Sequence, residues 1–181
     1  MLMETSDEDL ALAAAGGDRA AFALLLDRHY DRIFALAFRL FGRRADAEDL
    51  TQDICAALPA KLAGWRGDAR FTTWLYRVVV NACHDARRRL ATRAKAANGW
   101  GDWEKSRRAE AREAAEAQDW LQTAMARLGD DLRDTLALTL GEELTQAEAA
   151  EVLGVSEGTI AWRMSEVKRK LRAMAAEEGV A

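Results

Sequence analysis

Aromatic and arginine residues alternate in the segment GWRGDARFTTWLYRVVVNACHD, which runs from Gly64 to Asp85. The segment holds Trp65, Arg66, Arg70, Phe71, Trp74, Tyr76 and Arg77. Aromatic rings stack on unpaired bases, and arginines follow a nucleic-acid backbone. The same rings could instead fill a hydrophobic core, so the segment indicates either a core or a surface for single-stranded nucleic acid.

Helical spacing separates the residues after Thr72 into two stripes. One is apolar and is expected to face the core: Leu75, Val78, Val79, Ala82 and Ala86. The other is expected to be exposed and to suit single-stranded DNA: Trp74, Arg77, Asn81, His84 or Asp85, and Arg88. The loop Gly64–Arg70 could form a pocket beside Trp65 for a base turned out of its stack. Phe71 or Trp74 taken alone could still be a core residue.

A second group of residues with binding chemistry lies near the C-terminus, in TQAEAAEVLGVSEGTIAWRMSEVKRKL. Thr145 and Glu148 have the spacing of a capping box, Gly154 predicts a tight turn, and Ser156 predicts the start of another helix. Two helices joined by a short glycine turn are typical of a helix-turn-helix, whose second helix enters the major groove.

The outer face of that second helix supplies the candidate contacts with duplex DNA. Thr159, Arg163 and Lys168 could hold phosphates, which position a helix without reading sequence. Trp162, Ser165 and Glu166 are expected to face base edges, with Ala161 beside them on the same face. The alternative is a helical hairpin whose charged face is merely solvated.

Carboxylates form a third cluster on the helix expected from Ala45 to about Leu62. Asp49, Gln52 and Asp53 share one side, and Asp46 comes just before them. This stripe could be a solvated face, or it could match arginines on a protein partner. A nuclease using these carboxylates and Glu48 with a divalent ion is the enzymatic alternative. Cys55 and Cys83 are too far apart in sequence for a zinc site, and we expect neither metal nor cofactor.

The remaining sequence predicts an all-α fold that positions these groups. The 181 residues are rich in helix formers and include a single proline. We expect a helical bundle over residues 1–92, a linker over 93–117 that contains Trp100 and Trp103, and a helix-turn-helix domain over 118–181. The net charge of −4 hides separate acidic and basic segments, which suggests two kinds of partner. The acidic N-terminus and the lack of a long apolar run predict a cytoplasmic protein without membrane insertion.

Three motifs together resemble a known family. DAEDLTQDI (46–54), GWRGDARFTTWLYRVVVNACHDARRR (64–89) and LTQAEAAEVLGVSEGTIAWRMSEVKRKLR (144–172) look like the bacterial RNA polymerase sigma factors. The layout of two domains with nothing extra between them resembles the extracytoplasmic-function (ECF) group. The resemblance covers nearly the whole chain except the linker.

The resemblance implies roles for individual residues. Asp46, Asp49, Leu50, Gln52 and Asp53 would bind the clamp of the polymerase's largest subunit. The −10 element would be opened and held by Trp65, Arg66, Arg70, Phe71, Trp74, Arg77, Asn81 and Arg88. The −35 element would be read by Thr159, Ala161, Trp162, Arg163, Ser165, Glu166 and Lys168. The resemblance also implies an anti-sigma partner and no catalysis by this chain. A stand-alone helix-turn-helix regulator is the alternative, and it would bind duplex DNA without polymerase.

Overall fold

The computed structural model describes residues 5–96 and 120–177, and within them it contains helices and no strands. This confirms the all-α prediction. The N-terminal helices are α1 (Asp7–Ala15), α2 (Arg19–Phe41), α3 (Arg44–Leu62) and α4 (Phe71–Ala96). The C-terminal elements are α6 (Trp120–Arg127), α7 (Asp130–Leu136), the π-helical turn η1 (Ala137–Gly141), α8 (Gln146–Leu153) and α9 (Glu157–Glu177). Trp100 and Trp103 lie outside the described residues.

Several helix ends follow from capping residues visible in the sequence. The Asp18 side chain accepts hydrogen bonds from the first N–H groups of α2, and the capping box of Thr145 and Glu148 opens α8. Gly154 ends α8 in the left-handed conformation, with φ of 65°, and Ser156 accepts from the N–H of Thr159. The helix-turn-helix is therefore formed by α8 and α9, as predicted.

Two helix starts are formed without a capping side chain from the preceding residue. The helix α4 begins at Phe71, whose N–H donates a hydrogen bond at 3.1 Å to the Glu8 carboxylate on α1. Asp130 and Asp131 lie inside the first turn of α7, and Gly129 takes the capping position. At its other end α4 extends to Ala96, past the expected domain boundary at residue 92.

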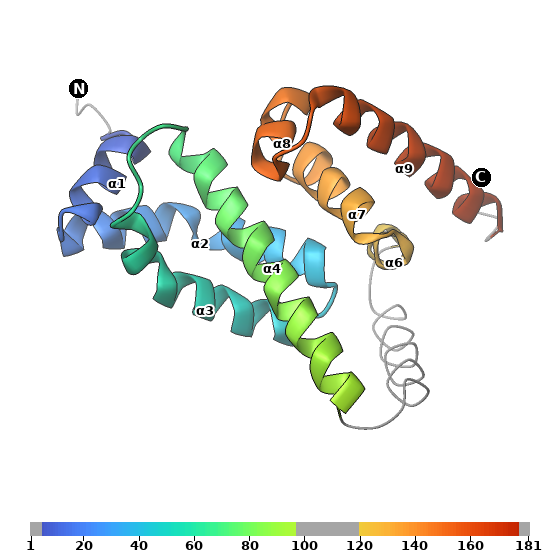
Figure 1. The fold of residues 1–181 in the computed structure, drawn as a ribbon, viewed down its shortest axis with the longest axis horizontal. Helices are drawn as coiled ribbons and strands as arrows, with labels where there is room; N and C mark the ends of the chain where they lie inside the picture. The colour runs from blue at the N-terminus through green and yellow to red at the C-terminus, as the bar shows by residue number, and fades with distance from the viewer. Residues whose placement is uncertain (1–4, 97–119, 178–181) are drawn as a thin grey trace.

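The position of α4 between the two halves of the molecule determines its burial. Figure 1 shows α4 with α2 and α3 on one side and the C-terminal helices on the other. Leu75 and Val79 are buried as predicted, whereas Val78, Ala82 and Ala86 are only half-buried. A second side of α4 is buried in their place, through Tyr76, Val80 and Cys83. The expected division into residues 1–92, 93–117 and 118–181 remains a prediction.

Among the described residues, no helix combines the length and the apolar character needed to cross a bilayer. The same residues hold no group of three or more acidic, histidine or cysteine side chains placed to bind a metal ion.

Candidate nucleic-acid interface

The aromatic cluster that precedes and opens α4 is mostly core. The Trp65 ring meets the Phe71 ring edge-on at 6.0 Å between centroids, and Trp74 lies 5.7 Å from Phe71. Trp65 is 7% exposed and Phe71 1% exposed, whereas Trp74 is half-buried. Because Trp65 and Phe71 are buried, the expectation that both rings face a bound strand is corrected. They support Trp74, the member of the cluster that reaches the surface.

The next turns of α4 carry the polar members of the predicted stripe. Asn81 is exposed, and Arg66 and Arg70 are exposed in the preceding loop. The guanidinium of Arg77 donates to the backbone carbonyls of Glu151 and Val152 on α8. Arg88 is 77% exposed and forms an ion pair with Asp85 at 3.6 Å. Trp74, Asn81 and Arg88 thus remain accessible, whereas Arg77 is engaged with the C-terminal domain.

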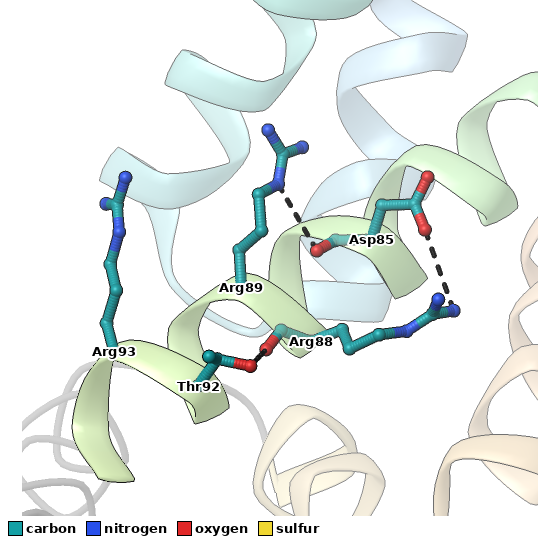
Figure 2. A pocket seen from close by; sticks show the side chains of 5 residues that line it. All are labelled: Asp85, Arg88, Arg89, Thr92 and Arg93. Carbon is teal, nitrogen blue, oxygen red and sulfur yellow. Dashed lines mark hydrogen bonds and ion pairs between the residues drawn. The ribbon is translucent and has the colours of Figure 1, made fainter. Parts of the chain in front are cut away.

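The C-terminal half of α4 lines an open basic hollow that extends this surface. Its lining is Asp85, Arg88, Arg89, Thr92 and Arg93. Figure 2 shows Arg89 and Arg93 reaching out on the same side of the helix, while Arg88 lies toward Asp85. Arg93 was not among the residues predicted to bind DNA. Its spacing of four from Arg89, which puts both on one helix face, is the signal that could have found it.

The outer face of α9 is largely open. Trp162 is 63% exposed, and Ala161, Ser165 and Lys168 are exposed beside it. Thr159 is half-buried and shares a hydrogen bond with Ser156 at the start of the helix. Glu166 forms an ion pair with Arg169 at 2.8 Å, so its carboxylate is already partnered on the same helix.

Arg163 differs from the other predicted DNA contacts on α9. Its guanidinium lies 2.9 Å from the Asp131 carboxylate on α7, and its side chain is only 13% exposed. The expectation of a free phosphate contact is therefore corrected: Arg163 ties α9 to α7. Sequence spacing could not reveal this, because the partner lies on another helix.

The predicted polymerase-binding stripe divides in a similar way. Asp49, Gln52 and Asp53 are exposed on α3. Asp46 is half-buried and pairs with Arg43 at 3.1 Å. Leu50 is 5% exposed and packs in the core, so it supports the stripe from beneath instead of presenting its side chain at the surface.

Charged contacts that the sequence did not predict join α4 to the C-terminal helices. His84 Nε2 lies 2.5 Å from a carboxylate oxygen of Asp134, a residue 2% exposed on α7. The hydrogen bond that His84 donates to the Asp134 carboxylate raises the pKa of His84 above its usual value. The Tyr76 hydroxyl donates to Glu142 at 2.9 Å, and burial together with the Glu142 charge raises the pKa of Tyr76 to about 12.

Comparison with known proteins shows the family. The chain matches the model described as Sigma-70 region 2 over residues 25–93 and the one described as Sigma-70, region 4 over residues 124–173. It is 33% identical over 169 residues to the ECF RNA polymerase sigma factor SigM of Mycobacterium tuberculosis, which covers 93% of this chain and 84% of the relative. The chain belongs to the ECF RNA polymerase sigma factors.

Three further similarities cover most of this sigma factor. It is 31% identical over 182 residues to the RNA polymerase sigma factor CnrH of Cupriavidus metallidurans, with 94% and 95% of the two chains covered. A solved structure of CnrH in complex with the cytosolic domain of CnrY has a TM-score of 0.71 at 29% identity and covers 96% of this chain. The sigma factor RpoE of Bartonella quintana, solved with the anti-sigma factor NepR, shares the fold with a TM-score of 0.64 at 20% identity over 86% of this chain.

The two regions correspond to the two candidate surfaces of the sigma factor. Region 2 spans most of α2 and all of α3, and it includes α4 as far as residue 93, while region 4 begins within α6 and ends within α9. A stand-alone helix-turn-helix regulator would need only the second of these. The matches to both regions therefore favour a sigma factor over that alternative.

Proposed function

We propose that this sigma factor binds core RNA polymerase and directs it to promoters through two separate DNA-binding surfaces. The observation that supports this proposal is that the chain has two exposed surfaces of different chemistry, one on α9 and one on α4. The outer face of α9 presents side chains from a rigid helix, which suits the major groove of duplex −35 DNA. The exposed face of α4 presents a ring, an amide and arginines, which suits an unpaired −10 strand.

The −10 strand is held mainly by Trp74, Asn81 and Arg88, which the fold leaves accessible. Stacking of one base on an aromatic ring contributes roughly 1–3 kcal/mol, which is comparable to the cost of unstacking that base from the duplex. Arg89 and Arg93 extend the positive surface along α4. They are positioned to follow the phosphate backbone without reading bases.

Polymerase is bound through the stripe of Asp49, Gln52 and Asp53 on α3. Exposed carboxylates on a rigid helix can form charge-assisted hydrogen bonds with arginines of the clamp on the largest subunit. A protein partner that covers such a surface would hold the sigma factor inactive. CnrH, which is 29% identical to this chain, was solved with the cytosolic domain of CnrY, and we propose an anti-sigma partner here too.

The sigma factor itself catalyses no reaction, because the polymerase performs RNA synthesis. It acts in the cytoplasm together with the polymerase. Run-off transcription from a randomised promoter pool with purified core polymerase tests the proposal. Adding this chain is expected to produce transcripts that share two conserved promoter elements. Transcripts that do not depend on the chain, or none at all, would contradict it. A chain carrying Asn81→Ala should yield fewer of the same transcripts.

A further inference from the structure

The outer face of α9 carries an ion pair in line with the exposed Trp162. Glu166 and Arg169 are three residues apart on the helix, and their side chains meet at 2.8 Å. Residues separated by three, four or seven positions share one helix face, so Arg169 follows Trp162 and Ser165 along the middle of the outer face. Arg169 therefore stands beside the residues proposed to face the −35 element.

The guanidinium of Arg169 is held along one of its edges. Its Nε lies 3.2 Å from Oε1 and 3.3 Å from Oε2 of Glu166, and its Nη2 donates to Oε2 at 2.8 Å. A guanidinium has five N–H donors in a rigid fork. Within the part of the chain that the structure describes, Nη1 has no acceptor, and the Arg169 side chain is 65% exposed. The edge formed by Nη1 and Nη2 therefore keeps two donors for a ligand.

The order of the two residues moves the guanidinium toward the start of α9. Side chains in a helix lean toward its N-terminus. Glu166 precedes Arg169, which is the favourable order for an acidic and a basic residue at helical spacing. The available edge of Arg169 is thereby carried back toward the first turns of α9. These are the turns that contact base edges when a recognition helix enters the major groove.

The charges of the pair favour a base over a phosphate as the ligand of Arg169. The fork of an arginine fits either one, because a phosphate and a guanine edge both offer two acceptors. Hydrogen bonds from Arg169 hold the pKa of Glu166 below its usual value, so the carboxylate is charged at neutral pH. That charge repels a phosphate beside the guanidinium. A guanine edge is neutral and presents O6 and N7 together, so it fits the pair better.

We propose that Glu166 and Arg169 act as one unit that reads a guanine of the −35 element, with Arg169 donating to guanine O6 and N7 and Glu166 holding the guanidinium in place. Arg169 is then a specificity-determining residue, and Glu166 is a positioning residue because it acts through Arg169. An exposed ion pair of this spacing contributes little to helix stability, so either side chain can be replaced without unfolding α9. The inference rests on the proposed function, since it requires that α9 binds duplex DNA.

Removal of the Glu166 charge should have two effects of opposite sign. A guanidinium that is held in advance loses less freedom when it binds a base, so release of Arg169 should lower the discrimination between sequences. Loss of a negative charge near the DNA should at the same time strengthen binding to every sequence. Glu166→Gln is therefore expected to tighten nonspecific binding and to weaken discrimination. A purely structural role of Glu166 would not produce this combination.

Fluorescence anisotropy of duplex binding by the holoenzyme tests the proposal. The probe is a labelled duplex that the wild-type holoenzyme enriches from a pool with a randomised −35 element, and a scrambled duplex measures nonspecific binding. Each guanine of the enriched element is replaced in turn by 7-deazaguanine, which lacks the N7 acceptor and keeps the base pair. The variants are Arg169→Ala and Glu166→Gln. Arg172→Ala is the matched control, because it removes the same charge from an exposed position three residues further along α9.

We expect 7-deazaguanine at one position to weaken binding of the wild type by about tenfold. Arg169→Ala should weaken binding to the unmodified duplex by a similar factor and should be insensitive to 7-deazaguanine at that position, because the interacting pair is already lost. Glu166→Gln should keep only part of this sensitivity and should bind the scrambled duplex more tightly. Arg172→Ala should weaken binding to both duplexes alike and keep the full sensitivity.

Equal sensitivity to 7-deazaguanine in the wild type and Arg169→Ala, or an enriched element without guanine, would overturn the proposal. Weaker binding of Arg169→Ala to all duplexes alike would also overturn it, because Arg169 would then contact a phosphate. Unchanged discrimination in Glu166→Gln would overturn the positioning role of Glu166. In each of these cases the enrichment itself still supports the proposed function. A wild-type holoenzyme that enriches no −35 sequence would instead contradict the proposed function, and the inference with it.

Discussion

His84 and Asp134 lie 50 residues apart in the sequence, and their side chains meet at 2.5 Å between the two domains. The carboxylate is almost fully buried, while the imidazole keeps about a third of its surface in water. Such a pair joins the protonation of one histidine to the contact between α4 and α7. The domain arrangement should therefore depend on pH.

The sign of this pH dependence follows from the raised pKa of His84, whose largest cause is the hydrogen bond to Asp134. Asp130 also favours the charged imidazole, whereas Arg87 and partial burial disfavour it. We call the arrangement seen here, in which α4 and α7 are in contact through His84 and Asp134, the closed form. Because its pKa is raised in this form, the histidine stabilises the closed form fully below its unpartnered pKa of about 6.5, and this contribution is lost as pH rises through the raised pKa. Closed molecules should be more abundant at about pH 6 than at about pH 8.

Small-angle X-ray scattering of the full chain between about pH 6 and about pH 8 measures this change as a change in the radius of gyration. His84→Gln is the control. Glutamine keeps a hydrogen-bond donor and does not titrate, so its radius of gyration should vary less with pH. The nearby charges on α7, Asp130, Arg133 and Asp134, and Arg87 on α4 are unchanged in this variant. An equal pH response in wild type and His84→Gln would exclude His84 as the source.

A second prediction concerns the stripe on α3. Asp49→Asn combined with Asp53→Asn should weaken binding to core polymerase, because each substitution removes a charge that can pair with an arginine of the clamp. Asp68→Asn, which changes an exposed carboxylate in the loop before α4, is the matched control and should bind normally. Biolayer interferometry measures the affinity of each variant for core polymerase. If Asp68→Asn weakens binding as much as the double variant does, the loss is a general charge effect and the prediction is wrong.

The face of α9 allows a third prediction that separates positioning from reading. Lys168→Ala should weaken binding to all −35 sequences alike and reduce the dependence of affinity on salt by about one counterion. Trp162→Ala should instead reduce discrimination between sequences, because an apolar contact with a thymine methyl distinguishes bases. Salt titrations of duplex binding by the holoenzyme, on selected and scrambled −35 sites, test both. A change in specificity from Lys168→Ala alone would reverse the assigned roles.

Local signals in the sequence were sufficient for the helix-turn-helix. The capping box of Thr145 and Glu148 and the left-handed Gly154 depend on residues within a few positions of one another. The exposed Trp162 likewise followed from helical spacing around the buried Ile160 and Val167. Hydrophobic period and capping are short-range properties, so one sequence is enough to predict them.

Contacts between distant segments could not be predicted in this way. Arg39 and Glu142, which form an ion pair, are 103 residues apart. Arg163 was predicted to be free to contact phosphate, but the structure pairs it with Asp131 on α7. Trp65 and Phe71 illustrate the same limit. Their alternation with arginine suggested a surface. In the structure Phe71 packs against His29 on α2, at 5.2 Å between ring centroids, and against Trp65, and both rings lie in the core. The sequence alone does not show which side of α4 another domain covers.

Permanganate footprinting of thymines in the −10 element is the most direct test of strand capture by α4. Holoenzyme with the wild-type chain is expected to make these thymines reactive. Trp74→Ala and Asn81→Ala should reduce their reactivity, while polymerase binding and the −35 footprint persist. Loss of the Trp74 ring should lower the affinity for the open strand by roughly 1–3 kcal/mol. Tyr30→Ala, which removes a ring 41% exposed on α2, should have no effect. Unchanged −10 reactivity with both α4 variants would contradict the account.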